Sequence, residues 1–252
     1  MTQRPHNSYL SKIFSVAGSD DPQCAVERLL RGYRDDRDTL RTIASKCGVD
    51  AIIEEPLPFD GGIFELPADR IVIKLNSYAN ATRKKFTLAH EIGHLLIASI
   101  SGKSRAMSCR RSAHLERACD MIAAELLMPS AQVRMAVEEL KFSSPQNLKV
   151  LADRFGVSLL VAARRVHDDL RLWSRQIGMW KWDSSPSEVW FVGKRPWNTR
   201  NPGYAAFETA RQSQQTVRSY DVTRRGDSVE PISLELLNLG RNYILGLIGV
   251  AS

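Results

Sequence analysis

The chain has 252 residues, a formal net charge of +7, and 43% hydrophobic and 25% charged side chains. This composition is ordinary for a soluble globular protein, and it supplies enough apolar side chains for a sizeable core. The modest charge excess excludes a strongly basic tail of the nucleic-acid-binding kind. No apolar run approaches the roughly 20 residues of a membrane-spanning helix, so we expect no membrane partner.

Four cysteines are scattered along the chain without a Cys-x-x-Cys pair: Cys24, Cys47, Cys109 and Cys119. The N-terminus lacks the apolar segment of a secretory signal peptide. Without secretion, scattered cysteines are typical of free thiols in a reducing compartment. We therefore expect a cytoplasmic protein.

The first third of the chain predicts a change from helix to sheet. Residues 1–24 are polar, and we expect a poorly ordered lead. One helix is predicted from Ala25 to Cys47, where apolar residues recur at helical spacing and Gly48 provides a stop signal. Three short strand-like runs separated by Pro and Gly then predict a small sheet: Asp50–Glu55, Gly62–Leu66 and Arg70–Leu75.

The next predicted helix carries the pattern His-Glu-x-x-His, and Asn80 or Thr82 can cap its N-terminus. At about 100° per residue, His90 and His94 lie one turn apart on the same face, so both imidazoles can reach one metal ion. Glu91 is placed to hold a water beside that ion rather than to bind the ion itself. The alternative is a chance occurrence of the pattern on a buried helix.

The first turn of this helix is basic, with Arg83, Lys84 and Lys85 in succession. Cations at this position oppose the helix dipole, which favours acidic side chains at an N-terminus. These residues form either a solvated basic turn or the approach for an acidic stretch of substrate. A basic loop, 102–112, is expected after the helix.

A catalytic zinc site needs a third protein ligand, and the following helix supplies a candidate. This helix is predicted from Ala113 to Met128, and Pro129 stops it. Glu116 can be the third ligand. Asp120 lies one turn later on the same face, where it can hydrogen-bond the far nitrogen of a ligating imidazole.

Other acidic and imidazole side chains are weaker candidates for this role. Glu125 lies nine residues after Glu116 and therefore points to the opposite side of the helix. His114 also faces elsewhere if the helix is regular at its start. His6 and His167 have no neighbouring partner signal and are interpreted as surface or packing residues. A solvated acidic face remains the alternative for Glu116 and Asp120.

The helical pattern continues through 131–182. Within it, residues 147–166 have a helix-turn-helix cadence with Gly156 at the turn, and Arg164 and Arg165 could contact phosphate. Helical pairs of this form also serve as packing units, so we favour a structural or substrate-docking role. The composition changes at residue 183, which predicts a small C-terminal α/β subdomain, 183–252, of unknown role.

Two strings carry a resemblance to a known family. Arg83-Lys-Lys-Phe-Thr-Leu-Ala-His-Glu-Ile-Gly-His-Leu-Leu, followed by Glu116-Arg-Ala-Cys-Asp-Met-Ile-Ala-Ala-Glu-Leu-Leu-Met-Pro, resembles the ImmA/IrrE family of bacterial and phage metallopeptidases. The resemblance covers about residues 25–180, and we assign 25–182 to this domain. It implies an α+β fold with a mostly helical, zincin-like domain and a small sheet.

The resemblance also implies a gluzincin-like site. His90, His94 and Glu116 would bind the metal, and Glu91 would be the catalytic base. Asp120 stands where the family usually has Asn or Asp. Cys119 stands where the family usually has Ala, and we expect it to pack as a small hydrophobic residue.

The function implied is that of a metal-dependent endopeptidase. Family members typically cleave helix-turn-helix repressors, so the expected partner is a repressor or an antitoxin-like protein, and direct DNA binding is disfavoured. The expected cofactor is Zn²⁺, and Mn²⁺ also fits the ligand set. Two alternatives stay open: a non-catalytic metal-containing module that binds a repressor or DNA, and a peptidase that is latent until an activator arrives.

Overall fold

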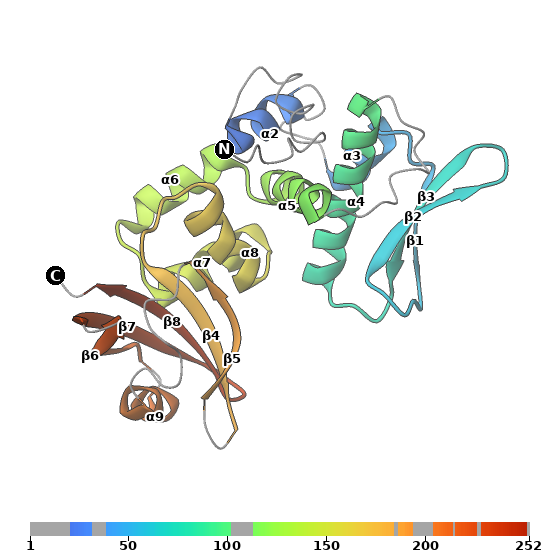
Figure 1. Ribbon diagram of the computed structural model, residues 1–252. Coiled ribbons are helices and arrows are strands. Elements are labelled where there is room, and N and C mark those ends of the chain that lie inside the picture. Colours follow the sequence, from blue (N-terminus) through green and yellow to red (C-terminus); the bar gives the residue numbers. More distant parts are fainter. Residues whose placement is uncertain are drawn as a thin grey trace, which may run out of the picture. The chain divides into compact units, whose positions relative to one another are not determined.

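The computed structural model describes residues 21–31, 39–101, 113–183, 186–193, 204–213, 215–225 and 228–250 (Figure 1). Helices and two separate sheets make up the fold, which confirms the predicted α+β class. The described residues divide into two compact units on either side of the bond between Ser130 and Ala131.

The first unit consists of helices packed with a small sheet. Its elements are α2 (Pro22–Arg31), α3 (Leu40–Lys46), β1 (Ala51–Glu55), β2 (Gly61–Leu66), β3 (Arg70–Asn76), α4 (Ala81–Ser101) and α5 (Ala113–Leu127). The predicted lead, 1–24, overlaps α2, because that helix already begins at Pro22. Residues 1–20, which include His6, lie outside the described residues, as does the predicted basic loop, 102–112.

The single helix predicted from Ala25 to Cys47 is wrong. The structure has α2 and α3 instead, and residues 32–38 between them lie outside the described part. A new helix starts at Leu40 because Thr39 is extended (φ −83°, ψ 163°) and its side-chain oxygen accepts a hydrogen bond from the backbone N–H of Thr42 at 3.2 Å. A threonine that caps a helix in this way favours a helix start over a helix interior.

The predicted sheet of the first unit is confirmed, with strand order β1-β3-β2. β1 runs parallel to β3, and β2 runs antiparallel to it. The central strand β3 is the most buried, with Ile71, Val72, Ile73 and Leu75 at most 3% exposed. The sheet packs against α4, which contacts both β2 and β3.

The second unit combines helices with a five-stranded antiparallel sheet of order β5-β4-β8-β7-β6. Its elements are α6 (Ser130–Leu140), α7 (Pro145–Phe155), α8 (Leu159–Arg164), a π-helical turn (Arg165–Asp169), β4 (Gln176–Trp182), β5 (Pro186–Val192), α9 (Tyr204–Gln212), β6 (Val217–Arg225), β7 (Ser228–Gly240) and β8 (Tyr243–Val250). The apolar residues Tyr243–Val250 form β8, an interior strand of this sheet.

Two sequence expectations differ from this arrangement. The helical pattern expected through residue 182 ends earlier, because 176–182 form strand β4. The boundary expected at residue 183 falls between β4 and β5, which pair with each other in one sheet. The side chains of β4 alternate between the two faces of that sheet, and such a short strand is easily read as part of a neighbouring helical pattern.

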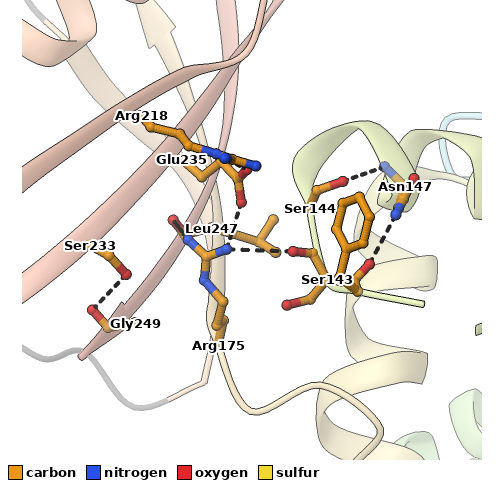
Figure 2. A network of polar contacts seen from close by, with 10 residues as sticks. Ser143, Ser144, Asn147, Arg175, Arg218, Ser233, Glu235, Leu247 and Gly249 are labelled. Carbon is orange, nitrogen blue, oxygen red and sulfur yellow. Dashed lines mark hydrogen bonds and ion pairs between the residues drawn. The ribbon is translucent and has the colours of Figure 1, made fainter. Parts of the chain in front are cut away.

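The two faces of this sheet have different neighbours. One face packs against α9 through an apolar cluster: Trp180, Trp182, Ala206, Phe207, Ala210, Leu234, Leu236, Ile244 and Ile248. The opposite face holds Glu235, which is 5% exposed. Arg175 Nη1 donates to Glu235 Oε2 at 2.6 Å, and Arg218 Nε donates to Glu235 Oε1 at 3.0 Å (Figure 2). Both oxygens of this buried carboxylate therefore have a cationic partner.

The helical pair within 147–166 is present as α7 and α8. Ser144 caps α7 by accepting a hydrogen bond from Asn147 N at 3.0 Å, and Gly156 ends it in the left-handed region (φ 61°). Arg164 is exposed, but Arg165 is fully buried and lies 3.8 Å from Asp169. The expectation that Arg165 could contact phosphate is therefore wrong for this structure.

Cys24, Cys47 and Cys119 are free thiols, and Cys109 lies outside the described residues. Among the helices that the structure describes, none combines the length and the apolar character needed to cross a membrane.

Candidate metal centre

The centre is built on α4, a helix whose start and burial follow from its sequence. Asn80 caps it, with Oδ1 accepting a hydrogen bond from Arg83 N at 2.8 Å, whereas Thr82 lies inside the first turn. Leu88, Ala89, Ile92, Leu96 and Ile97 are at most 7% exposed. Such a helix runs through a core rather than along a surface. In the middle of this helix the polar residues Glu91 and His94 are 8% and 7% exposed.

The second helix of the centre, α5, approaches α4 closely at Gly93. A Cβ atom at position 93 would lie 3.1 Å from Cys119 Cα and 3.3 Å from Cys119 O. These distances are shorter than nearly all real Cβ contacts, so glycine permits the approach. The approach brings the face of α5 that carries Glu116 and Asp120 within reach of α4.

The predicted ligands converge in the structure. The Nε2 atoms of His90 and His94 lie 3.2 Å apart. Glu116 Oε2 lies 3.2 Å from His90 Nε2, and Glu116 Oε1 lies 3.7 Å from His94 Nε2. Atoms that surround a tetrahedral ion at metal–nitrogen distances near 2.0–2.1 Å are separated by roughly 3.3 Å. The spacing of the three side chains thus fits a single divalent ion.

The chemistry of these atoms also fits a cation. His90 Nδ1 lies 2.9 Å from Asp120 Oδ1, so the proton on that nitrogen is donated to Asp120 and Nε2 is left as an acceptor. That acceptor faces a carboxylate oxygen of Glu116. Oε1 of Glu116 is buried, with no hydrogen-bond partner among the described residues. Converging acceptors repel one another unless a proton or a metal ion lies between them.

The charges around His90 favour its protonated form. Burial alone would lower the pKa of His90, but the hydrogen bond to Asp120 and the charges of Asp120, Glu91 and Glu116 outweigh it. The pKa of His90 is therefore raised above its ordinary value. The same negative surroundings that retain a proton would retain a metal cation.

Glu91 lies on α4 beside His90 and is 8% exposed. Its charge contributes to the raised pKa of His90 and to that of the Cys119 thiol. These charge effects show that the Glu91 carboxylate is close enough to His90 and Cys119 to act on both electrostatically.

The sequence did not predict that Cys119 lies near His90 and His94. It is fully buried, as expected of a small apolar residue, but its Sγ also lies within 4.8 Å of the nearest ligand atoms of His90 and His94. Burial and the charges of Glu116, Glu91 and Asp120 raise the pKa of the Cys119 thiol. The carboxylate oxygens of Glu116 lie 3.2 and 3.7 Å from Nε2 of His90 and His94, and Cys119 lies beside this group. Cys119 follows Glu116 by three residues on α5, but its distance from the histidines depends on how α4 and α5 pack.

The three basic residues in the first turn of α4 have different surroundings. Arg83 forms an ion pair with Asp60, and the hydrogen bond between them is the main reason why the pKa of Arg83 is raised. The charge of Asp120 makes a smaller contribution in the same direction. The main partner of Arg83 is therefore Asp60. Lys84 instead pairs with Glu54 at 2.6 Å, and Lys85 is exposed.

The weaker candidates lie away from the ligand cluster. Glu125 is buried, where it accepts hydrogen bonds from Gln23 at 2.7 Å and from Ser130 N at 3.1 Å. His114 is exposed at the start of α5. His167 belongs to the second unit and pairs with Asp168 at 2.8 Å.

Comparison with known proteins adds three findings. Residues 44–167 match a peptidase family model described as the IrrE N-terminal-like domain. Over 110 residues the chain is 34% identical to the radiation response metalloprotease IrrE of Deinococcus radiodurans, a match that covers 40% of this chain and 32% of that protein. The chain thus spans about a third of this relative's length.

The fold resembles a solved structure of a transcriptional regulator from Mycobacterium tuberculosis, with a TM-score of 0.58 and 16% identity. That likeness covers 98% of this chain and 81% of the other. At this identity it concerns the fold alone.

Proposed function

Because this chain belongs to the ImmA/IrrE metallopeptidase family through residues 44–167, we propose that it is a zinc-dependent endopeptidase that cleaves a regulatory protein. The observation that carries the proposal is the convergence of His90 Nε2, His94 Nε2 and Glu116 within 3.2–3.7 Å of one another. Three protein donors leave a tetrahedral ion one open position, which distinguishes a catalytic site from a closed structural one.

His90, His94 and Glu116 would hold the ion. When bound, a zinc ion supplies a Lewis acid that polarises the scissile carbonyl and acidifies water. Mn²⁺ is compatible with the same two imidazoles and one carboxylate. The remaining chemistry belongs to side chains of the chain itself.

Glu91 acts as the general base in this proposal. Its carboxylate accepts the proton of the attacking water and then delivers it to the amine that leaves. Burial suits this role, because a desolvated carboxylate is a stronger base than a solvated one.

Asp120 is a positioning residue. Its hydrogen bond with His90 Nδ1, at 2.9 Å, fixes the tautomer that leaves Nε2 available, and it also fixes the orientation of the ring. We assign Arg83 contact with an acidic stretch of the substrate, because its side chain is exposed in the basic first turn of the helix that carries His90 and His94.

The proposed substrate is a helix-turn-helix repressor or an antitoxin-like protein. Support for this class comes from the resemblance of the two strings around His90 and Glu116 to peptidases that cleave such proteins. The partner is best sought among proteins encoded next to this chain. The proposed setting is the cytoplasm, where free thiols such as those of Cys24, Cys47 and Cys119 persist.

The test is whether the purified, zinc-loaded chain cleaves a helix-turn-helix protein that is encoded next to it. We expect cleavage by the wild type and a loss of about 10²–10⁴-fold in rate for Glu91→Gln, the range typical of removing a general base. Metal content should stay the same in this variant, because Glu91 is not a ligand. Arg134→Glu, on the exposed face of α6, is the control that should retain the full rate. Full activity of Glu91→Gln would refute the mechanism.

A second candidate function rests on Cys119. If its thiolate joined the two histidines and Glu116, four protein ligands would close the coordination sphere, and the domain would be a non-catalytic binding module. The absorption spectrum of the cobalt-substituted protein separates the two candidates. A thiolate–cobalt charge-transfer band that disappears in Cys119→Ala supports the closed site, and its absence supports the peptidase.

A further inference from the structure

The metal centre contains two sets of donors that share the imidazoles of His90 and His94. One set is completed by the carboxylate of Glu116, whose oxygens lie 3.2 and 3.7 Å from the two Nε2 atoms. The other is completed by the thiol of Cys119, because its Sγ and one ring nitrogen from each histidine all lie within 4.8 Å of one another. The two sets differ in a single donor, which is oxygen in one and sulfur in the other.

Cys119 is held beside the histidines by the packing of two helices. It is fully buried on α5, and a Cβ atom at Gly93 would lie 3.4 Å from its Cβ atom. Gly93 lies between His90 and His94 along α4, so α5 approaches within the turn that carries both imidazoles. The position of the thiol is therefore set by a contact between helix backbones.

The two sets are not equally ready to bind. An ion at about 2.0–2.1 Å from nitrogen and about 2.3 Å from sulfur separates these two donors by roughly 3.6–3.8 Å. Sγ of Cys119 must then move by about 1 Å at most, which a turn about the Cα–Cβ bond supplies. Glu116 already lies at ligand spacing, so an ion without a strong preference for sulfur binds with the carboxylate.

Soft ions have this preference. Thiolates select copper(I), and imidazole is also a good ligand for copper, whereas a carboxylate suits harder ions. From the two donor sets we propose that the centre binds copper(I) through Cys119 and the two histidines, in place of the divalent ion that Glu116 and the same histidines hold. Binding releases the thiol proton to solvent and changes no oxidation state.

The shared histidines make the two ions exclude each other. In the reducing cytoplasm that we propose as the setting, copper is held as copper(I). A rise in copper(I) would then displace zinc from the centre and switch off cleavage. This consequence rests on the proposed peptidase function, but copper(I) binding itself does not, and it is measured without a substrate.

Anaerobic titration of the full, metal-free chain with copper(I) tests the proposal. Bicinchoninate, a chelator of copper(I), is present as competitor, so that single exposed thiols such as Cys24 stay unloaded while three converging donors act together. We expect one copper(I) ion per chain, and we expect added zinc to lower the apparent affinity for copper(I).

Three variants assign the donors. Cys119→Ser keeps the size of the side chain and removes the sulfur, so copper(I) affinity should fall by more than the roughly 10–100-fold typical of losing an outer-shell partner. Zinc affinity should change little in this variant. Glu116→Gln should show the reverse, with weakened zinc and retained copper(I). Cys24→Ser removes an exposed thiol and is the matched control that should change neither affinity.

The melting temperature of each metal-free variant shows that it is folded, and Cys119→Ala repeats the test without a buried hydroxyl. Unchanged copper(I) affinity in both Cys119 variants overturns the proposal. Simultaneous binding of one zinc and one copper(I) ion overturns it as well, as does an equal loss of both affinities in Cys119→Ala. A chain that passes these titrations but cleaves no protein would refute the proposed function and leave this inference standing.

Discussion

Glu116 in the first unit and Glu235 in the second both bury carboxylate oxygen, but their surroundings differ. Glu235 has a guanidinium on each oxygen, from Arg175 at 2.6 Å and from Arg218 at 3.0 Å. Glu116 instead faces the Nε2 atoms of His90 and His94, at 3.2 and 3.7 Å, and its Oε1 has no hydrogen-bond partner among the described residues. Glu235 is paired with permanent cations, whereas Glu116 is paired with groups that can hold either a proton or a metal ion.

This difference separates a structural polar group from a functional one. A buried charge is costly unless it is paired, so a folded protein normally supplies the partner. At Glu235 the chain supplies two guanidinium groups, whereas at Glu116 it supplies two imidazoles, which in their neutral forms can bind a metal ion together with the carboxylate. Exposure differs as well, since the Glu235 side chain is 7% exposed and the Glu116 side chain is 33% exposed.

The largest expected effect concerns Glu116. Glu116→Gln should lower metal affinity by more than the roughly 10–100-fold typical of losing an outer-shell partner, because a direct ligand loses its charge. The melting temperature of the metal-free protein should change little, because the Glu116 side chain is 33% exposed and ion pairs at exposed groups contribute little to stability. Metal titration and thermal melts measure both quantities. A variant that binds metal normally would show that Glu116 is not a ligand.

Glu235→Gln should have the opposite pattern. We expect a loss of about 2 kcal/mol in unfolding free energy, because Arg175 keeps a poorer acceptor and Arg218 is exposed enough to be solvated. Metal affinity should not change. Denaturant unfolding measures the first quantity. If this variant instead lost metal and kept its stability, the contrast between the two carboxylates would be wrong.

A smaller effect is expected for the pH dependence of metal binding. The raised pKa of His90 means that the metal-free site holds its proton above the ordinary histidine value of 6.5. Because a metal must displace this proton, affinity should fall as the pH is lowered, beginning above that value. Asp120→Asn removes the main raising interaction, so the fall should move to lower pH while affinity at high pH drops by about tenfold. Metal titrations across pH, with wild type as the control, measure this.

The smallest effect is expected at Gly156, which ends α7 with φ at 61°. Gly156→Ala should cost about 1 kcal/mol in unfolding free energy, because a Cβ disfavours this region. Metal content should be unaffected. If Gly156→Ala lowered the metal content as well as the unfolding free energy, the two units would not be energetically separate.

The sequence was most informative where spacing alone sets geometry. The four-residue interval between His90 and His94 predicted a shared helix face, and the same interval between Glu116 and Asp120 predicted a second face. The structure brings these faces together. The strands of the small sheet were also predictable, since Pro and Gly mark their ends.

The remaining features depend on contacts between distant residues. Nothing local shows that Thr39 begins a new helix rather than continuing the old one. Strand β4 was assigned to a helix because its partners, β5 and β8, are specified by residues up to about 70 positions later. The place of Cys119 depends on how closely α4 and α5 pack, which the interval between residues on one helix does not report.

That packing has a consequence for the choice of ion. Two of the proposed ligands come from α4 and one from α5, so the gap between the helices would set the metal–oxygen distance, and Gly93 is the residue that lets the gap be small. Added bulk at this position would force the helices apart by a few tenths of an ångström. The proposed ligands His90, His94 and Glu116 would then lie farther apart and would suit an ion of larger radius. On this ligand set, the lack of a Cβ atom at position 93 therefore favours a smaller ion.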